Sequence, residues 1–342
     1  MGDFHVPPRG QASWAAAGML APLAETRERS PLLDLGIESL GIYPAFVDEL
    51  AEVSGSDVEI QGPGMIRLAR TEKDLVLLHS LYDWQQGLGV PLERLSCEEV
   101  ARLEPALGSE QVGGLLSPLE RHIAPRRLLL ALCRAAAAGG VWLKAHSPVE
   151  GFVAHGGRVN AVETPAGVVS CRELLLAGGA WNGGLASRLH LEIPISPIRG
   201  QVVSIACAGV LKHTIYTHQG YLVPRESGEL IAGATEDEAG FNCYPTAEGV
   251  KAILDFATSV VPALGSAPFD GACAGLRPVT PDRLPVLGSI PGWDNAHVAG
   301  GHFRNGVLLA PVTASRMAGW ILERKTWEGM DGVSAERFGN EA

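Results

Sequence analysis

The stretch that decides the fold is GGHFRNGVLLAP, residues 300–311. It follows a short apolar run, residues 295–299, that is typical of a buried strand. From 307 to 322, apolar residues recur at helical spacing. A strand, a glycine-containing turn and a helix that begins near Gly306 leave the first backbone N–H groups of the helix unpaired. Because these donors lie at the positive end of the helix dipole, the pattern predicts a binding site for a negatively charged group.

The same turn carries polar side chains, and two interpretations of them stay open. Arg304 is a permanent cation whose forked N–H donors match a carboxylate. An ordinary loop with a surface arginine is the simpler interpretation, and a lone pair of glycines would favour it. Two glycines together with His302, Arg304, Asn305 and Gly306 within seven residues make a ligand site an equal alternative.

Two further stretches identify a family. They are GLRPVTPDRLPVLG, residues 275–288, and ASWAAAGML, residues 12–20. Together with AGGHFRNGVLLAP, residues 299–311, they resemble the amine-oxidising, FAD-dependent enzymes of the D-amino acid oxidase and glycine oxidase family. The resemblance extends over nearly the whole chain, and the three motifs occur in the family's order.

The resemblance implies a mixed α/β fold with two interleaved domains. One is a Rossmann-like FAD-binding domain of the D-amino acid oxidase type, and the other is a substrate domain built on an antiparallel sheet. We expect the FAD-binding domain at residues 1–57, 119–195 and 274–326, the substrate domain at 58–118 and 196–273, and a C-terminal tail at 327–342.

The family's cofactor is FAD, and its contacts can be carried over onto matching positions of this chain. A reduced flavin carries negative charge, and the N-terminus of a helix directed at that charge would stabilise it. The residues implied as cofactor contacts are Ala12, Ser13, Ala17, Gly18, Met19, Val149, His302, Phe303, Arg304, Asn305, Gly306, Val307 and Leu308.

For the substrate, the resemblance implies Arg277 as the clamp for a carboxylate, with Arg304 beside it and Tyr221 lining the site. Without the resemblance, Arg277 would be interpreted as a partner in a surface ion pair, and Tyr221 as a tyrosine of the core or a strand face. Small uncharged residues precede Arg277, and Leu276 and Pro278 flank it, which favours a site. Gln219 stands near a position where some relatives have histidine, so the preferred substrate is expected to differ.

One family feature is missing from the start of the sequence. Family members begin with a strand, a GxGxxG turn and a helix that together hold the FAD pyrophosphate. No GxGxxG occurs near residue 1. The expectation is therefore a chain truncated at its N-terminus, which binds FAD weakly and tends to aggregate. Strands near 174–177 and 296–299 are expected to flank the missing strand.

Composition limits the class of protein. The chain has 342 residues, 46% hydrophobic and 19% charged, which excludes disorder and allows two domains. A formal net charge of −11 argues against a nucleic-acid partner. No apolar run reaches the length of a membrane span. The six cysteines contain no CxxC pair and are typical of reduced thiols in a cytoplasmic protein, with no metal site: Cys97, Cys133, Cys171, Cys207, Cys243 and Cys273.

Periodicity and capping residues predict the elements around these motifs. Helices are expected from Ser30 to Leu50, over 72–87, over 97–103, over 125–138 and over 246–261. Strands are expected at 62–69, 112–117, 142–146, 149–155, 159–164, 201–206, 213–224 and 230–235. Gly156 and Gly157 form the turn of a predicted hairpin.

The family resemblance implies an FAD-dependent enzyme that oxidises glycine or another small amino acid or amine to the imine. Molecular oxygen would be the acceptor, peroxide the product, and thiamine thiazole synthesis the destination. The alternatives are an enzyme similar to sarcosine oxidase or D-amino acid dehydrogenase, or a non-catalytic flavoprotein remnant. The sequence leaves the preferred amine, the electron acceptor and a homo-oligomeric state open.

Overall fold

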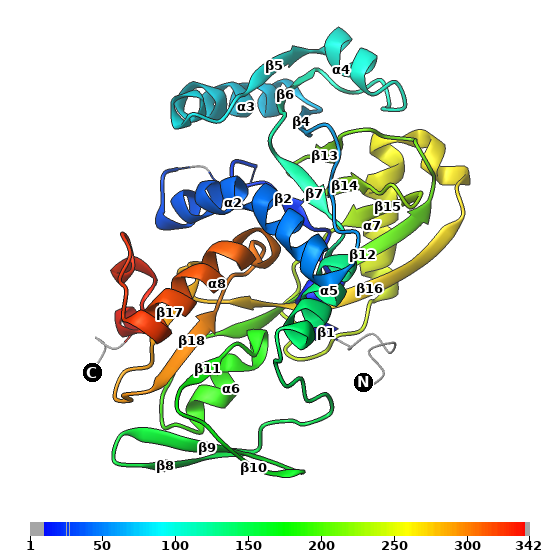
Figure 1. Cartoon of the computed structure of the whole chain (residues 1–342). Helices are drawn as coiled ribbons and strands as arrows, with labels where there is room; N and C mark the ends of the chain where they lie inside the picture. The colour runs from blue at the N-terminus through cyan, green and yellow to red at the C-terminus, as the bar shows by residue number, and fades with distance from the viewer. Residues whose placement is uncertain (1–9, 25, 27, 339–342) are drawn as a thin grey trace.

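A nine-stranded sheet dominates the computed structural model, which describes residues 10–24, 26 and 28–338 (Figure 1). Its strands lie in the order β1 (Gly10–Gln11), β16 (Phe269–Val279), β12 (Ser196–Ala206), β15 (Glu229–Gly233), β14 (Tyr221–Pro224), β13 (Thr214–Tyr216), β4 (Met65–Ala69), β6 (Gly113–Ser117) and β5 (Glu93–Ser96). Most neighbours are antiparallel, whereas β1 with β16 and β13 with β4 are parallel. The predicted mixed α/β fold is confirmed.

The longest strand pair of this sheet joins β12 to β16. Their register extends from Ser196 opposite Val279 to Ile205 opposite Phe269. The sequence did not predict β16 as a strand, because its glycines and alanines show no clear alternation of apolar and polar residues. The expected domain boundary at 273/274 falls inside this strand.

One predicted strand, 213–224, is divided by a turn into β13 and β14. The Thr217 hydroxyl accepts hydrogen bonds from the backbone N–H groups of Gln219 and Gly220, at 3.1 and 3.2 Å. This short-range capping by a threonine reverses the chain, so the two halves pair with each other as antiparallel strands.

A smaller sheet contains β11 (Leu174–Leu176), β18 (Ala296–Gly300) and β17 (Val286–Ser289). The predicted strand at 295–299 is confirmed as β18. We expected 174–177 and 296–299 to lie on either side of a missing strand, but β11 and β18 pair directly and in parallel, with Leu174 opposite Ala296.

The remaining strands form two three-stranded sheets. One contains β8 (Gly151–His155), β9 (Arg158–Thr164) and β10 (Gly167–Ser170); the other contains β2 (Met19–Leu20), β7 (Arg121–Ile123) and β3 (Ile60–Gln61). The predicted hairpin turn at Gly156 and Gly157 is confirmed, and both glycines have positive φ. The predicted strand at 142–146 is wrong. Its residues are exposed, so their apolar side chains have no sheet face to pack against.

Helices cover the sheets, and the predicted caps of three of them are confirmed. Ser30, Ser96 and Thr246 each accept a hydrogen bond from the first turn of the helix that follows. The α-helices are α1 (Ala12–Ala15), α2 (Pro31–Ser54), α3 (Glu72–Gln85), α4 (Cys97–Leu103), α5 (Pro125–Ala138), α6 (Asn182–Ser187), α7 (Ala247–Val260) and α8 (Gly306–Glu323). The 3-10 helices are η1 (Gln86–Leu88), η2 (Gly179–Trp181), η3 (Pro262–Ser266), η4 (Asp331–Val333) and η5 (Ala335–Phe338). None of the helices in the described part of the chain is long and apolar enough to cross a membrane.

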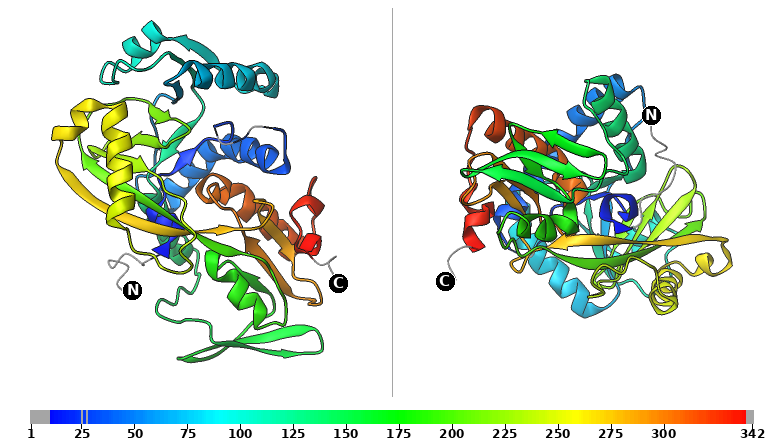
Figure 2. Two further views of the ribbon diagram at one scale, coloured as in Figure 1. Left: turned by 180° about the vertical axis from the view of Figure 1, so that it is seen from behind. Right: turned by 90° about the horizontal axis from the view of Figure 1, so that it is seen from below.

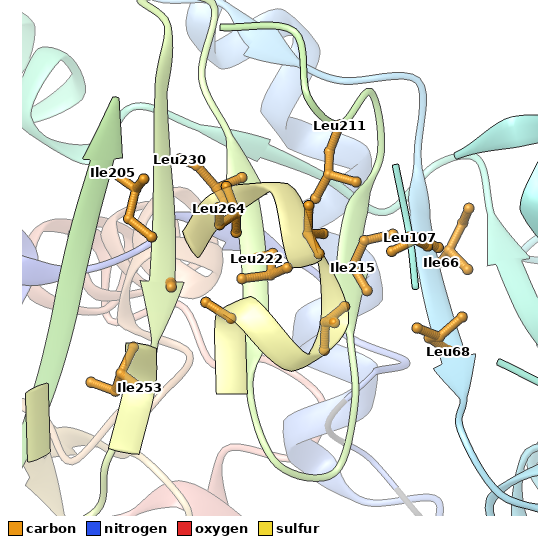
Figure 3. Packing of buried hydrophobic residues seen from close by; sticks show 14 of the residues in the cluster. Ile66, Leu68, Leu107, Ile205, Leu211, Ile215, Leu222, Leu230, Ile253 and Leu264 are labelled. Carbon is orange, nitrogen blue, oxygen red and sulfur yellow. The ribbon is translucent and has the colours of Figure 1, made fainter. Parts of the chain in front are cut away.

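The two faces of the large sheet have different neighbours. Val203 and Ile205 of β12 belong to the core cluster that also contains Ile253 of α7, together with Leu222 and Leu230 (Figure 3). Val202, the alternate residue of β12, lies on the opposite face beside Tyr221 and Ala17. Figure 2 shows α7 along one side of β12 and β16. The face that carries Val202 therefore lies against the segment around Ala17 and near the start of α8.

Candidate active site

A cavity of about 810 Å³ lies between the Val202 face of the sheet, the segment that contains α1, and the start of α8. This volume is within the usual range for a small-molecule site. The residues predicted from the sequence that line it are Ala12, Ser13, Ala17, Gly18, Met19, Tyr221, Arg277, His302, Phe303, Arg304, Asn305, Gly306 and Val307. Two predicted contacts do not line it. Val149 lies in the segment before β8, and Leu308 is buried in the core between α2 and α8.

The start of α8 presents backbone donors to this cavity. The first intrahelical hydrogen bond is donated by Leu309 to the carbonyl of Asn305, at 2.8 Å. The N–H groups of Gly306, Val307 and Leu308 precede it, and the Asn305 side chain makes no capping hydrogen bond. The positive end of α8 therefore adjoins the cavity, as the glycine-rich stretch predicted.

Two hydroxyl groups of α2 fix the first turn of α8. Pro311 has no N–H, so the Val307 carbonyl cannot receive the usual bond from four residues later. The Tyr43 hydroxyl donates to that carbonyl at 2.5 Å, and the Ser39 hydroxyl donates to the Leu308 carbonyl at 2.6 Å. Both side chains are buried, and burial raises the pKa of Tyr43 above its usual value. These two hydrogen bonds were not predicted from the sequence, although a proline five residues after Gly306 indicates a carbonyl without its usual helical partner.

Arg277 reaches the cavity across a glycine. Its Nη1 donates to the Thr235 carbonyl at 2.9 Å, and its guanidinium lies over Gly200 on the neighbouring strand β12. A Cβ at Gly200 would be 2.2 Å from the Arg277 Cζ, so no larger residue fits there without displacing the guanidinium. Gly200 is a site residue that was not predicted from the sequence.

Arg304, which lines the cavity, is paired with an acidic side chain. Its Nη1 donates to Glu236 Oε1 at 2.6 Å, and the two side chains are 22% and 35% exposed. Glu236 was not predicted from the sequence. Arg304 and Arg277 line the same cavity and are held by consecutive residues, Glu236 and Thr235.

Tyr221 lies on the cavity wall and is buried. Its hydroxyl packs against the backbone of Gly233, where an added Cβ would be 2.8 Å from the phenolic oxygen. Tyr221 is therefore in the cavity, as predicted, and its position depends on a glycine of β15.

We expect Tyr221→Phe to reduce kcat/KM less than any substitution of Arg277. A hydroxyl can orient a carboxylate, but it cannot neutralise the charge, and a neutral hydrogen bond contributes about 0.5–1.5 kcal/mol. Side-by-side kcat/KM measurements on FAD-loaded variants would check this ranking. A tyrosine variant more impaired than the arginine variant would reverse the assigned roles.

His302 is a neutral imidazole in this site. Its Nε2 lies 3.0 Å from the Thr313 hydroxyl on α8, and burial lowers its pKa to about 4. Burial, together with the nearby charge of Arg225, likewise lowers the pKa of His122 to about 3.

These two histidines make stability depend on pH in a defined window. Between pH 6.5 and about 4 the unfolded chain binds protons that the folded chain does not, so the free energy of unfolding falls as the pH falls. We expect His302→Gln to remove a contribution of about 3 kcal/mol across that window, and to leave the dependence above pH 7 unchanged. Chemical denaturation at several pH values would measure the slope. An unchanged slope would show that His302 titrates normally.

The cavity wall is built largely from small residues and fits a flat aromatic ring. Gly179 has a φ of +59° and no atom within 4 Å of the position of a Cβ, so backbone borders open space there. Ala15, Ala16, Gly178 and Gly300 add further small surfaces. This wall and the donors of α8 suit the ring of a flavin.

Comparison with known proteins decides the family. The model of the DAO family, described as FAD dependent oxidoreductase, matches residues 5–320. The chain belongs to this family. It is therefore an FAD-dependent oxidoreductase, and the predicted cofactor and enzyme class are confirmed.

Members of the family with known names resemble the chain over most of its length. The glycine oxidase of Geobacillus kaustophilus (strain HTA426) is 33% identical over 317 residues, which cover 92% of this chain and 84% of that protein. The bifunctional protein ThiO/ThiG of Synechocystis sp. (strain ATCC 27184 / PCC 6803 / Kazusa) is 33% identical over 96% of this chain and 48% of its own length. The crystal structure of the Geobacillus kaustophilus glycine oxidase superposes with a TM-score of 0.91 and 31% identity, over 96% of this chain and 90% of that one.

Proposed function

We propose that this enzyme oxidises the carbon–nitrogen bond of glycine or another small amino acid to an imine, with molecular oxygen as acceptor and peroxide as product. One observation carries the proposal: the guanidinium of Arg277 lines the cavity and is held by an uncharged backbone carbonyl, so its charge is available for a substrate carboxylate. The names of the glycine oxidase and ThiO/ThiG relatives support the substrate and a role in thiamine thiazole synthesis.

Some residues of this chain bind the substrate, and others stabilise negative charge in the cavity. Arg277 binds the carboxylate with its forked donors, and the Tyr221 hydroxyl orients it. The first-turn N–H groups of α8 favour negative charge in the adjoining part of the cavity without any reorganisation. FAD, when bound, supplies the redox chemistry by accepting a hydride equivalent from the substrate carbon. His302, Phe303 and the small residues of the wall shape the ring site.

Charge also determines which form of the substrate reacts. A hydride leaves the α-carbon most readily when the amine is neutral, because its lone pair then forms the imine bond. Burial lowers the pKa of His302 to about 4, so at neutral pH this side chain adds no positive charge that would oppose the charge developing on that nitrogen.

The proposal is tested by measuring how fast each candidate amine reduces the flavin of the FAD-loaded enzyme. Purified protein with FAD would be mixed anaerobically with glycine, sarcosine and D-alanine in turn, and flavin absorbance followed. Admission of oxygen should then restore the oxidised spectrum and release one peroxide per flavin reduced. Faster reduction by sarcosine or D-alanine would favour the corresponding oxidase or dehydrogenase alternative. A protein that binds FAD but is reduced by no amine would contradict the proposal and favour a non-catalytic flavoprotein.

A further inference from the structure

Three consecutive residues between β15 and α7 each hold one arginine. The Thr235 carbonyl accepts from Arg277, Glu236 Oε1 accepts from Arg304, and Asp237 Oδ2 accepts from the Nε of Arg199 at 3.2 Å. Because the three acceptors are consecutive in the chain, three guanidinium groups lie close to one short segment, residues 235–237.

The three partners differ in charge. The Asp237 carboxylate is ionised; burial opposes this, but hydrogen bonds from Gln201, Thr235 and Arg199 hold its pKa below the usual value. It therefore neutralises Arg199, which is nearly buried. Glu236 forms an ion pair with Arg304, whose Nη1 lies 2.6 Å from Glu236 Oε1. A backbone carbonyl carries no net charge, and Arg277 forms no ion pair with the residues that the structure describes.

The two arginines that line the cavity thus have different capacities for an anion. Arg277 can accept a carboxylate without losing an ionic partner. A second carboxylate at Arg304 would have to displace Glu236, or lie beside it, and like charges in a partly buried site repel strongly.

We propose that Glu236 is a specificity-determining residue, which occupies Arg304 and restricts the substrate to amines that carry a single carboxylate. The inference rests on the proposed function, because it assigns a substrate carboxylate to Arg277. Glu236 acts by excluding a second negative charge and takes no part in the oxidation itself.

The test compares glycine with iminodiacetate, which is glycine with a second carboxymethyl group on its nitrogen. In Glu236→Gln the amide oxygen can still accept from Arg304, so the contact is kept and only the charge is removed. We expect the ratio of kcat/KM for iminodiacetate to that for glycine to rise about tenfold in the FAD-loaded variant. Glu238→Gln removes the same charge two residues away, at an exposed side chain that pairs with no cation of the described residues, and should leave the ratio within about twofold of wild type.

A binding measurement keeps this inference separate from the proposed reaction. Acetate and malonate do not react, and their binding can be followed by the perturbation of flavin absorbance. Malonate should bind about tenfold more tightly to Glu236→Gln than to wild type, while acetate changes little. If the wild type oxidises no amine, the proposed function fails, and the malonate result alone decides the role of Glu236. An unchanged malonate affinity with an unchanged substrate ratio, or an equal effect of Glu238→Gln, would overturn the inference.

Discussion

Arg277→Lys is expected to lower kcat/KM for glycine by roughly 30- to 1000-fold, which corresponds to about 2–4 kcal/mol of transition-state stabilisation. Lysine keeps the charge but loses the fork, and its ammonium cannot hold the Thr235 carbonyl and a carboxylate in the same geometry. Flavin content should change little, because the start of α8 is untouched. Steady-state kinetics and the flavin-to-protein absorbance ratio measure the two effects separately.

Substitution of Gly200 tests the role of Arg277 in carboxylate binding independently. Gly200→Ala places a Cβ 2.2 Å from the Arg277 Cζ, and the flexible side chain can move away while the strand stays folded. The expected loss of kcat/KM is similar to that of Arg277→Lys. Gly271→Ala is the matched control, since no atom lies within 4 Å of its Cβ position on the adjacent strand β16. Normal kinetics in both Arg277→Lys and Gly200→Ala would remove Arg277 from carboxylate binding.

The sequence was sufficient for the part of the site that is local in the chain. A strand, a turn and a helix start occur together between 295 and 322, and α8 begins at Gly306 as its apolar spacing predicted. Helix caps at Ser30, Ser96 and Thr246 are equally local, because the hydroxyl and its N–H partner are three residues apart. Such features can be predicted without knowledge of the rest of the fold.

Contacts between distant segments could not be predicted in the same way. Glu236 meets Arg304 across 68 residues, and the Tyr43 hydroxyl meets the Val307 carbonyl across 264. Neither partner is marked by its neighbours, and Glu236 lies among other acidic residues with the same local pattern. The family resemblance supplied Arg277 and Tyr221, but it did not supply the residues that hold them, Thr235, Gly200 and Gly233.

The incorrect strand predictions have a common cause. Alternation of apolar residues shows that a segment could pair, but a sheet edge must be available to receive it. Residues 142–146, Trp-Leu-Lys-Ala-His, alternate only in part and pair with no described strand, and Trp142 is exposed. β16 has a poor pattern, but it pairs with β12 along its whole length and with β1 at Gly275 and Leu276, and it is one of the longest strands.

Gly18→Ala is expected to destabilise the protein by about 3 kcal/mol or more and to weaken flavin binding. Gly18 has a φ of +77°, and an added Cβ would lie 2.1 Å from the Ile123 carbonyl oxygen and 2.7 Å from Pro125 Cγ. These atoms belong to backbone and a rigid ring, so the segment that carries Ala17 and Met19 would have to shift at the cavity wall.

The matched control for this substitution is Gly41→Ala, which should act in the opposite direction. Gly41 lies inside α2, and no atom is found within 4 Å of its Cβ position, so alanine should stabilise the helix by about 0.5–1 kcal/mol. Thermal unfolding of both variants, with FAD titrated by fluorescence quenching, measures stability and affinity together. Position 18 requires glycine if Gly18→Ala loses both thermal stability and FAD affinity while Gly41→Ala loses neither. An alanine at Gly18 that unfolds at the wild-type temperature would mean that the segment from Ala17 to Met19 can move aside, and that the cavity wall is not fixed by the close approach of Gly18 to β7.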